Sequence, residues 1–327
     1  MFSRSKKWST LRVILFIMAV IPVFAFALVV GDLCWNGAQA VAKVGLGNLF
    51  STQISTIYSG IYNPGQFGLL PAVVGTIQVV VVALLLAFPI SLAMAVAASE
   101  FSLGWSGRLI ELLLSVFAGI PPIVYALLSL FVVKSFIQPK FTAVELADSL
   151  IKTLPGLPQW SAGMLPIDQS TILGGMFLAL LIIPFMAPLI LNSIRNVPKE
   201  QKEASLALGA NHWYTLGRII LPNALPGIIT ALTLGVLKAS GDVVISSWTI
   251  GFVHNGLPDP IWDIFERNAP LDSTGAGLVG GFFGAGASAG LNFSVASFAA
   301  LLLLLFAFAV QVAAGLLRKR LNRRYQA

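Results

Sequence analysis

Six long apolar segments divide the chain, and charged residues fall almost entirely between them. A helix that crosses a bilayer needs about 20 predominantly apolar residues. The segments cover residues 13–33, 69–98, 109–138, 171–194, 222–252 and 292–317. The pattern therefore predicts an all-α, polytopic membrane protein with about six transmembrane helices. The stretches at 34–68, 139–170 and 253–291 are then expected to be loops on the external side.

The first apolar segment allows two interpretations. Basic residues precede it, and Ala25-Phe26-Ala27 resembles the cleavage site of a signal peptide. The apolar run from Val13 to Val30 has 18 residues, longer than the usual signal-peptide core of about 7–15. We therefore expect a retained helix, with a cleavable signal peptide as the alternative.

Composition narrows the class of protein further. Apolar residues make up 57% of the 327 residues and charged residues only 10%, whereas a soluble globular protein has about 25% charged residues. A disordered chain is excluded, because such chains are poor in apolar residues. Cys34 is the single cysteine, so a disulfide scaffold is excluded. His212 and His254 fall on opposite sides of the predicted membrane, and we expect no metal site.

The net charge is +7, and the basic residues responsible for it are placed unevenly along the chain. With the N-terminus inside and six spans, 14 Lys and Arg residues lie on the cytoplasmic side and 5 on the external side, with Lys238 inside a span. Cytoplasmic loops of membrane proteins carry this excess. Both termini are therefore expected to be cytoplasmic, in a cell inner membrane, and the basic ends are expected to contact the lipid bilayer rather than a nucleic acid.

The most polar segment between two predicted spans covers residues 195–222. Pro198 suits the first position of a helix, and Glu200 and Glu203 suit its first turns. Gly209 then supplies a break before the chain enters the fifth span. The segment is expected to form a short helix on the cytoplasmic membrane surface.

The same segment resembles the EAA loop of ABC-importer permeases, whose pattern is E-A-A-x3-G-x9-I-x-L-P. The departure from that pattern is a serine in place of the second alanine. The matching positions, with that serine, are Glu203, Ala204, Ser205, Gly209, Ile219, Leu221 and Pro222. The resemblance implies a coupling helix that docks on a separate ATPase. The chain has no G-x-x-x-x-G-K-[ST] motif, so ATP is expected to be bound by that partner, with no cofactor and no catalysis in this chain.

Other stretches resemble the phosphate permeases of this family, the PstA/PstC type. They are Gly68-Leu69-Leu70-Pro71 with Gly75-Thr76, the stretch 118–125, and Lys238-Ala239-Ser240-Gly241-Asp242, which stands where those permeases have R-A-x-G-E. The resemblance covers residues 68–317, the permease core. It leaves 1–67 as an N-terminal helix and loop, and 318–327 as a basic tail, within one transmembrane domain.

These stretches supply the candidate substrate pathway: Lys238, Asp242, Gly119, Pro121, Pro122 and Thr76. Lys238 can offer a positive charge to an oxyanion; alternatively, it and Asp242 only neutralise each other one helical turn apart. Gly119, Pro121 and Pro122 interrupt the third span, as a pathway wall or as a packing kink. Thr76 contacts substrate or makes a bond between helices.

The function expected from the resemblance is ATP-driven import of inorganic phosphate. The partners implied are an ATPase dimer, a second permease subunit (identical or related), and an external solute-binding protein that docks on loops 139–170 and 253–291. Lysine cannot grip an oxyanion in the bidentate way that arginine does. Sulfate, molybdate, tungstate or phosphonate therefore remain alternatives. A channel, enzyme or structural scaffold that acts alone is the alternative from another class.

Overall fold

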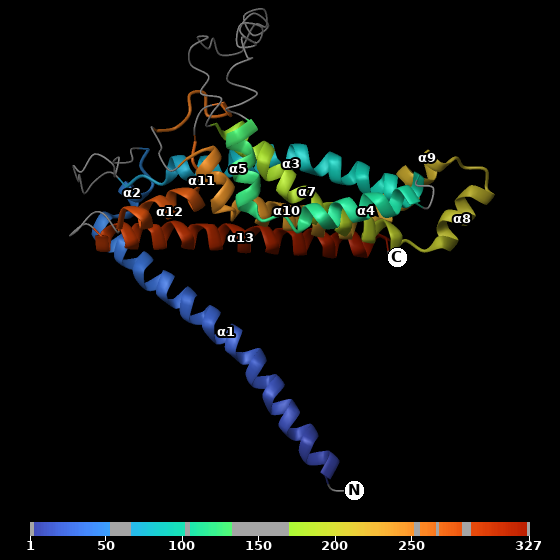
Figure 1. The fold of residues 1–327 in the computed structure, drawn as a ribbon, viewed down its shortest axis with the longest axis horizontal. Helices are drawn as coiled ribbons and strands as arrows, with labels where there is room; N and C mark the ends of the chain where they lie inside the picture. The colour runs from blue at the N-terminus through green and yellow to red at the C-terminus, as the bar shows by residue number, and fades with distance from the viewer. Residues whose placement is uncertain are drawn as a thin grey trace, which may run out of the picture.

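The computed structural model describes residues 3–52, 67–101, 105–132, 170–251, 256–265, 268–282 and 289–325. Within these ranges the regular structure is helical and no sheet is formed, as the sequence predicts. Five helices are long and apolar enough to cross a membrane, and a bent pair of shorter helices adds a sixth crossing if it is taken as one span. All of them except the first, which extends away for most of its length, lie side by side in an elongated bundle (Figure 1).

The helices follow one another in a simple order. They are α1 (Ser3–Val44), α2 (Leu46–Leu49), α3 (Leu70–Val96), α4 (Trp105–Ala118), α5 (Pro122–Val132), α7 (Thr171–Arg195), α8 (Lys199–Ala207), α9 (His212–Thr215), α10 (Leu221–Ser240), α11 (Val243–Thr249), α12 (Leu271–Phe282) and α13 (Ala289–Tyr325). Two π-helical turns, η2 (Ala97–Phe101) and η4 (Leu216–Ile220), continue α3 and precede α10.

The centre of the bundle is the pair α3 and α7, with α10 packed against both. Large side chains of α7, among them Leu178, Ile182 and Met186, are fully buried. Gly175 lets the two helices approach closely, because a Cβ there would overlap Val82 of α3. Small residues commonly provide such contact between membrane helices, where apolar surface alone does not drive association.

Two predicted spans are each two helices. The third, expected over 109–138, is α4 followed by α5, bent by 90° at the break. The fifth, expected over 222–252, is α10 followed by α11, with Gly241 and Asp242 between them. Apolar periodicity cannot reveal these breaks, because both halves of each segment are equally apolar. Gly119 and the two prolines did indicate the first one.

The prediction for the external segments was wrong in two places. Helix α1 continues to Val44 and takes up the first part of segment 34–68. Segment 253–291, expected to be a loop, contains α12, and residues 268–274 are all buried. The remaining expected loop, 139–170, lies outside the described residues except for Ser170.

Polar side chains at the start of α3 hold residues 261–271, part of segment 253–291, against the bundle. The Thr76 hydroxyl accepts a hydrogen bond from the Leu271 backbone N–H at 3.0 Å. The Gln78 amide donates to the Ile261 carbonyl at 2.7 Å and accepts from the Asn268 amide at 3.0 Å. Gly75 leaves room for the crossing, because a Cβ there would lie 2.5 Å from the Asn268 carbonyl oxygen. Helix α3 therefore satisfies the Ile261 carbonyl, the Asn268 amide and the Leu271 N–H of this segment.

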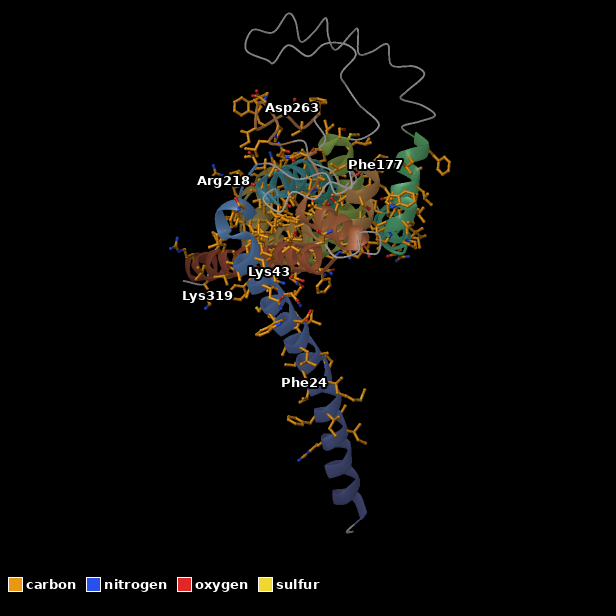
Figure 2. The ribbon with its side chains drawn as sticks, turned by 90° about the vertical axis from the view of Figure 1, so that its left-hand side faces the viewer. Phe24, Lys43, Phe177, Arg218, Asp263 and Lys319 are labelled. Carbon is orange, nitrogen blue, oxygen red and sulfur yellow. The ribbon has the colours of Figure 1, made fainter. Side chains whose placement is uncertain are left out.

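Helix α1 extends away from the bundle for most of its length. It packs at its C-terminal end, where Gly37 contacts Phe298 of α13. Figure 2 shows Phe24 on the extending part and Lys43 close to the body. The large apolar side chains from Ile14 to Val29 are exposed. Such a surface requires lipid or another protein chain to cover it.

Candidate functional site

The predicted coupling segment forms a short helix with a defined end. Helix α8 begins at Lys199, and Pro198 is its N-cap. The helix thus starts one residue later than the sequence predicted. At the other end, Gly209 has φ +85°, its N–H bonds to the Leu206 carbonyl, and the Ala210 N–H bonds to the Ser205 carbonyl. This is the Schellman arrangement, which requires a left-handed residue after the helix. Glycine adopts that conformation without strain.

Ser205, the residue that departs from the EAA pattern, faces inward. Its hydroxyl shares a hydrogen bond of 2.9 Å with the hydroxyl of Thr215 in α9, and both side chains are buried. Asn211 caps α9 by accepting from the Tyr214 N–H at 2.7 Å. The serine therefore ties α8 to the next helix, a contact that alanine could not make.

The rest of the motif forms the entry into α10. Ile219 lies in η4, and Leu221 and Pro222 occupy the first turn of α10, where proline is tolerated. All three are partly buried. The motif thus covers a helix, its cap, a turn and the start of the next long helix.

Two contacts connect the coupling segment to the end of α3. Lys202 Nζ lies 2.6 Å from Glu100 Oε1, with both side chains mostly buried. The rings of Trp213 and Phe101 lie 4.8 Å apart. Glu100 and Phe101 both belong to η2, so the π-helical turn carries both contacts. The sequence analysis missed them, because they join residues about one hundred positions apart.

The outer face of the coupling segment carries large exposed apolar side chains among polar ones. Leu208 is 89% exposed and Trp213 is 68% exposed. Glu203 and Ala204 lie on the exposed side as well. Large apolar side chains held in this way at the end of a bundle indicate an interaction surface. No local sequence pattern separates these two side chains from the other apolar residues of the segment, such as Leu206 and Leu216.

Lys238 and Asp242 do not share a helix. Lys238 lies in the last turn of α10, and its Nζ is 5.2 Å from the centre of the Phe185 ring of α7. Asp242 caps α11 by accepting the Ile245 N–H at 2.9 Å, and it is buried. Among the described residues the ion pairs are Lys202–Glu100 and Arg195–Glu111, so Lys238 and Asp242 are near one another without direct contact.

The other pathway candidates occupy two places. Gly119 and Pro121 are exposed at the break between α4 and α5, where the Tyr125 hydroxyl donates to the Phe117 carbonyl at 3.0 Å. Pro122 begins α5, which packs against α11, so this break is a neighbour of the Asp242 helix. Thr76 instead uses its hydroxyl on the Ala72 carbonyl and on Leu271. The structure therefore gives Thr76 the interhelical role and separates it from Lys238.

The described residues contain no group of three or more His, Cys, Asp or Glu side chains that could hold a metal ion. The hydrogen bonds and ion pairs described above lie mainly toward the two ends of the bundle. In Figure 1 the coupling segment lies at one end with the C-terminus of α13, and α11 and α12 lie toward the other.

The sequence of the chain matches a known family of membrane proteins. Residues 87–324 match the binding-protein-dependent transport system inner membrane component family, and the chain belongs to it. Two solved structures share the fold. One is a bacterial alginate ABC transporter in complex with an alginate-bound periplasmic protein, with a TM-score of 0.61 at 16% identity, covering 98% of this chain and 97% of that chain. The other is a bacterial ABC transporter involved in alginate import, with a TM-score of 0.56 at 17% identity, covering 96% and 99%.

Within this family the chain is similar to phosphate transport system permease proteins PstC. It is 29% identical to the protein of Xylella fastidiosa over 222 residues, which are 67% of this chain and 65% of that protein. It is 32% identical to the protein of Haemophilus influenzae over 186 residues, 57% of this chain and 58% of that protein. The matched part thus spans somewhat less than two thirds of each relative.

Replacing Gly209 with alanine is expected to loosen the end of α8. A left-handed conformation costs a residue with a Cβ about 1–2 kcal/mol. Amide hydrogen exchange over residues 199–210 should therefore become about tenfold faster or more. Gly217→Ala is the matched control, because the space around it is equally open but its φ is not in the left-handed region. Equal exchange in the two variants would contradict the assigned role of the cap.

Proposed function

We propose that this chain is the membrane permease subunit of an ATP-driven importer and that it translocates inorganic phosphate. The observation that carries the proposal is the capped coupling segment, with Leu208 and Trp213 exposed on it, at one end of a bundle of spanning helices. The similarity to PstC proteins supports phosphate as the substrate.

The partner on the coupling segment is a dimer of ATP-binding subunits. Helix α8 is short and ends in a tight cap, with Leu208 exposed at that cap and Trp213 exposed on the adjacent α9, which suits docking of this segment into a groove. ATP is hydrolysed in that partner, since the chain has no Walker A motif. The chain itself is a non-catalytic subunit that requires no cofactor of its own.

A second permease subunit, identical or related, covers the exposed apolar helices. The extending part of α1 and the outer faces of α4 and α5 supply such surface, with Leu112, Val116 and Phe131 among the exposed side chains. A paired arrangement places the break at Gly119 and Pro121 on the boundary between two subunits. The break then forms part of the wall of a shared pathway.

The orientation follows from charge. The coupling segment shares its end of the bundle with the basic C-terminus, and basic residues favour the cytoplasmic side (Figure 1). Both termini are therefore cytoplasmic. At the opposite, external end, Trp262 is 72% exposed beside the exposed Ile261 and offers a docking point for a solute-binding protein.

Lys238 provides the attraction for the anion. It is partly exposed and lies beyond the middle of α10. A lysine attracts an oxyanion as a compact charge that exchanges its hydrogen bonds readily, and this suits passage better than tight retention. Sulfate, molybdate, tungstate and phosphonate offer similar oxygens, so competition between anions decides among them.

Reconstitution tests the function directly. The chain, co-purified with its ATP-binding subunit and placed in liposomes with the external binding protein, is expected to take up radiolabelled phosphate when ATP is present. Excess sulfate, molybdate, tungstate or phosphonate should compete poorly. Strong competition by one of them would identify it as the substrate instead. Uptake that proceeds without ATP would overturn the proposal in favour of a channel that acts alone.

Replacing Lys238 with alanine is expected to lower phosphate uptake by about tenfold or more, because the pathway loses a partly desolvated positive charge. Lys238→Arg should retain uptake and strengthen anion binding, since a guanidinium can make bidentate contacts. Lys43→Ala serves as the control, because Lys43 is exposed and its Nζ donates to Gln39 of the same helix at 3.3 Å. Unchanged uptake in Lys238→Ala would remove this residue from the pathway.

Breaking the contact between Lys202 and Glu100 is expected to separate ATP hydrolysis from transport. Lys202→Glu should reduce uptake per ATP hydrolysed by about tenfold, which corresponds to losing one charge-assisted hydrogen bond of about 1.5 kcal/mol. The double change Lys202→Glu with Glu100→Lys should restore it.

The control for this experiment is the ion pair of Arg195 and Glu111, which lies at the same end of the bundle but is much more exposed. An exposed pair contributes little, so Glu111→Gln should leave the ratio of uptake to hydrolysis nearly unchanged. Failure of the double change to restore that ratio would show that this pair does not transmit motion.

A further inference from the structure

Three oxygen-bearing side chains meet where α11 packs against α12. Asp242 caps α11, Ser246 lies one turn further along it, and Asp272 lies in the first turn of α12. Ser246 is fully buried, and both acids are more than nine-tenths buried. Asp272 lies close enough to interact with Asp242 by charge and with the Ser246 hydroxyl. We refer to Asp242, Ser246 and Asp272 as the outer acid cluster.

The two acids in the cluster differ in the hydrogen-bond partners and charges that surround them. Asp242 accepts the Ile245 N–H and has Lys238 nearby. Neither carboxylate oxygen of Asp272 has a hydrogen-bond partner of ordinary geometry among the described residues, and neither does the Ser246 hydroxyl. A buried carboxylate without partners is strongly unfavourable while it is charged. Asp272 therefore requires a positive charge or a proton.

No neighbouring helix supplies the positive charge within the described part of the chain. Helices α11 and α3 contain no titratable residue, and in α12 Asp272 is the only one. The first charged residue of α13 is Arg318, near the far end of that helix. Lys238, on α10, faces Asp242. The charge that acts on Asp272 is that of Asp242, and it has the same sign.

We propose that the outer acid cluster is a proton-binding site, in which Asp272 holds an exchangeable proton and can donate it in a hydrogen bond to the Ser246 oxygen. The ligand is a proton rather than a metal cation, because Ca²⁺ or Mg²⁺ requires about six oxygen ligands. The cluster has two acids and one hydroxyl, and one carboxylate oxygen is already used by Ile245. The site is additional to the transport function and does not depend on the ATPase partner.

The electrostatics of Asp272 agree with this assignment. Burial raises the pKa of Asp272 from 3.8 to about 7, and the charge of Asp242 acts in the same direction. The nearby Ser273 N–H and Ser246 hydroxyl lower the pKa only in part. The folded protein therefore binds this proton more tightly than the unfolded chain does. The contribution to stability is greatest at low pH and is lost as pH rises from about 4 to about 7.

The test uses the full-length chain purified in lipid nanodiscs, with infrared spectroscopy and thermal unfolding measured from about pH 5 to about pH 8. We expect a carbonyl stretch of a protonated carboxyl group that disappears as pH rises through about 7 and is absent in Asp272→Asn. The wild-type Tm should fall over that range more steeply than the Tm of the variant. Ser246→Ala should keep the carbonyl band but shift its frequency.

Asp263→Asn is the matched control, because Asp263 is also a buried acid near this end, yet its Oδ1 accepts the Phe265 N–H at 2.9 Å. This variant should keep the infrared band. A wild-type spectrum without the band at low pH would overturn the proposal. A Tm that depends on Na⁺ at constant pH would also overturn it, by showing a metal cation in place of the proton. These measurements need no transport, so their failure is distinct from failure of the proposed function.

Discussion

The close packing of α3 against α7 is the constraint on which the remaining structure depends. It is made possible by small residues such as Gly175 facing Val82, and it places the two helices side by side over most of their length. At one end of the pair, Glu100 and Arg195 reach the coupling segment and α4. At the other end, Thr76, Gln78 and Thr171 bind the backbone of residues 261–271. The coupling segment at one end and residues 261–271 at the other are therefore both attached to the pair of helices α3 and α7.

The two ends of the bundle handle polar groups in different ways. At the coupling end, charges form pairs, the helix is capped, and apolar side chains are left exposed for a partner. At the opposite end, neutral amides and hydroxyls satisfy much of a buried segment, and the acids are buried with few partners. An interface that must be released repeatedly suits the first arrangement. A site that holds a charge out of water suits the second.

The sequence predicted the all-helical class, the positions of most spans and the short helix before Gly209, because long apolar runs and the motif around Gly209 carry strong local signals. It also identified the break at Gly119 through its two prolines. It did not reveal that Lys238 and Asp242 lie on separate helices, because a single glycine such as Gly241 does not predict a helix end inside an apolar segment. It also took 253–291 for a loop, since this segment begins with acidic residues and ends in a stretch rich in glycine and alanine. The partners that bury Asp263 and Asp272 come from distant parts of the chain, such as α3 and α11.

Helix α3 and its π-helical continuation run without a break from Leu70 to Phe101. At 1.5 Å per residue, these 32 residues form a rod of about 48 Å. The tip at Phe101 is held by Lys202 and Trp213, and the tip at Leu70 is bonded to Ile261 and Leu271. Tilting this rod by about 5° displaces one tip by about 4 Å relative to the other. A small tilt of α3 imposed at the coupling segment would therefore reach the opposite end of the bundle as a larger movement, with α3 as the lever.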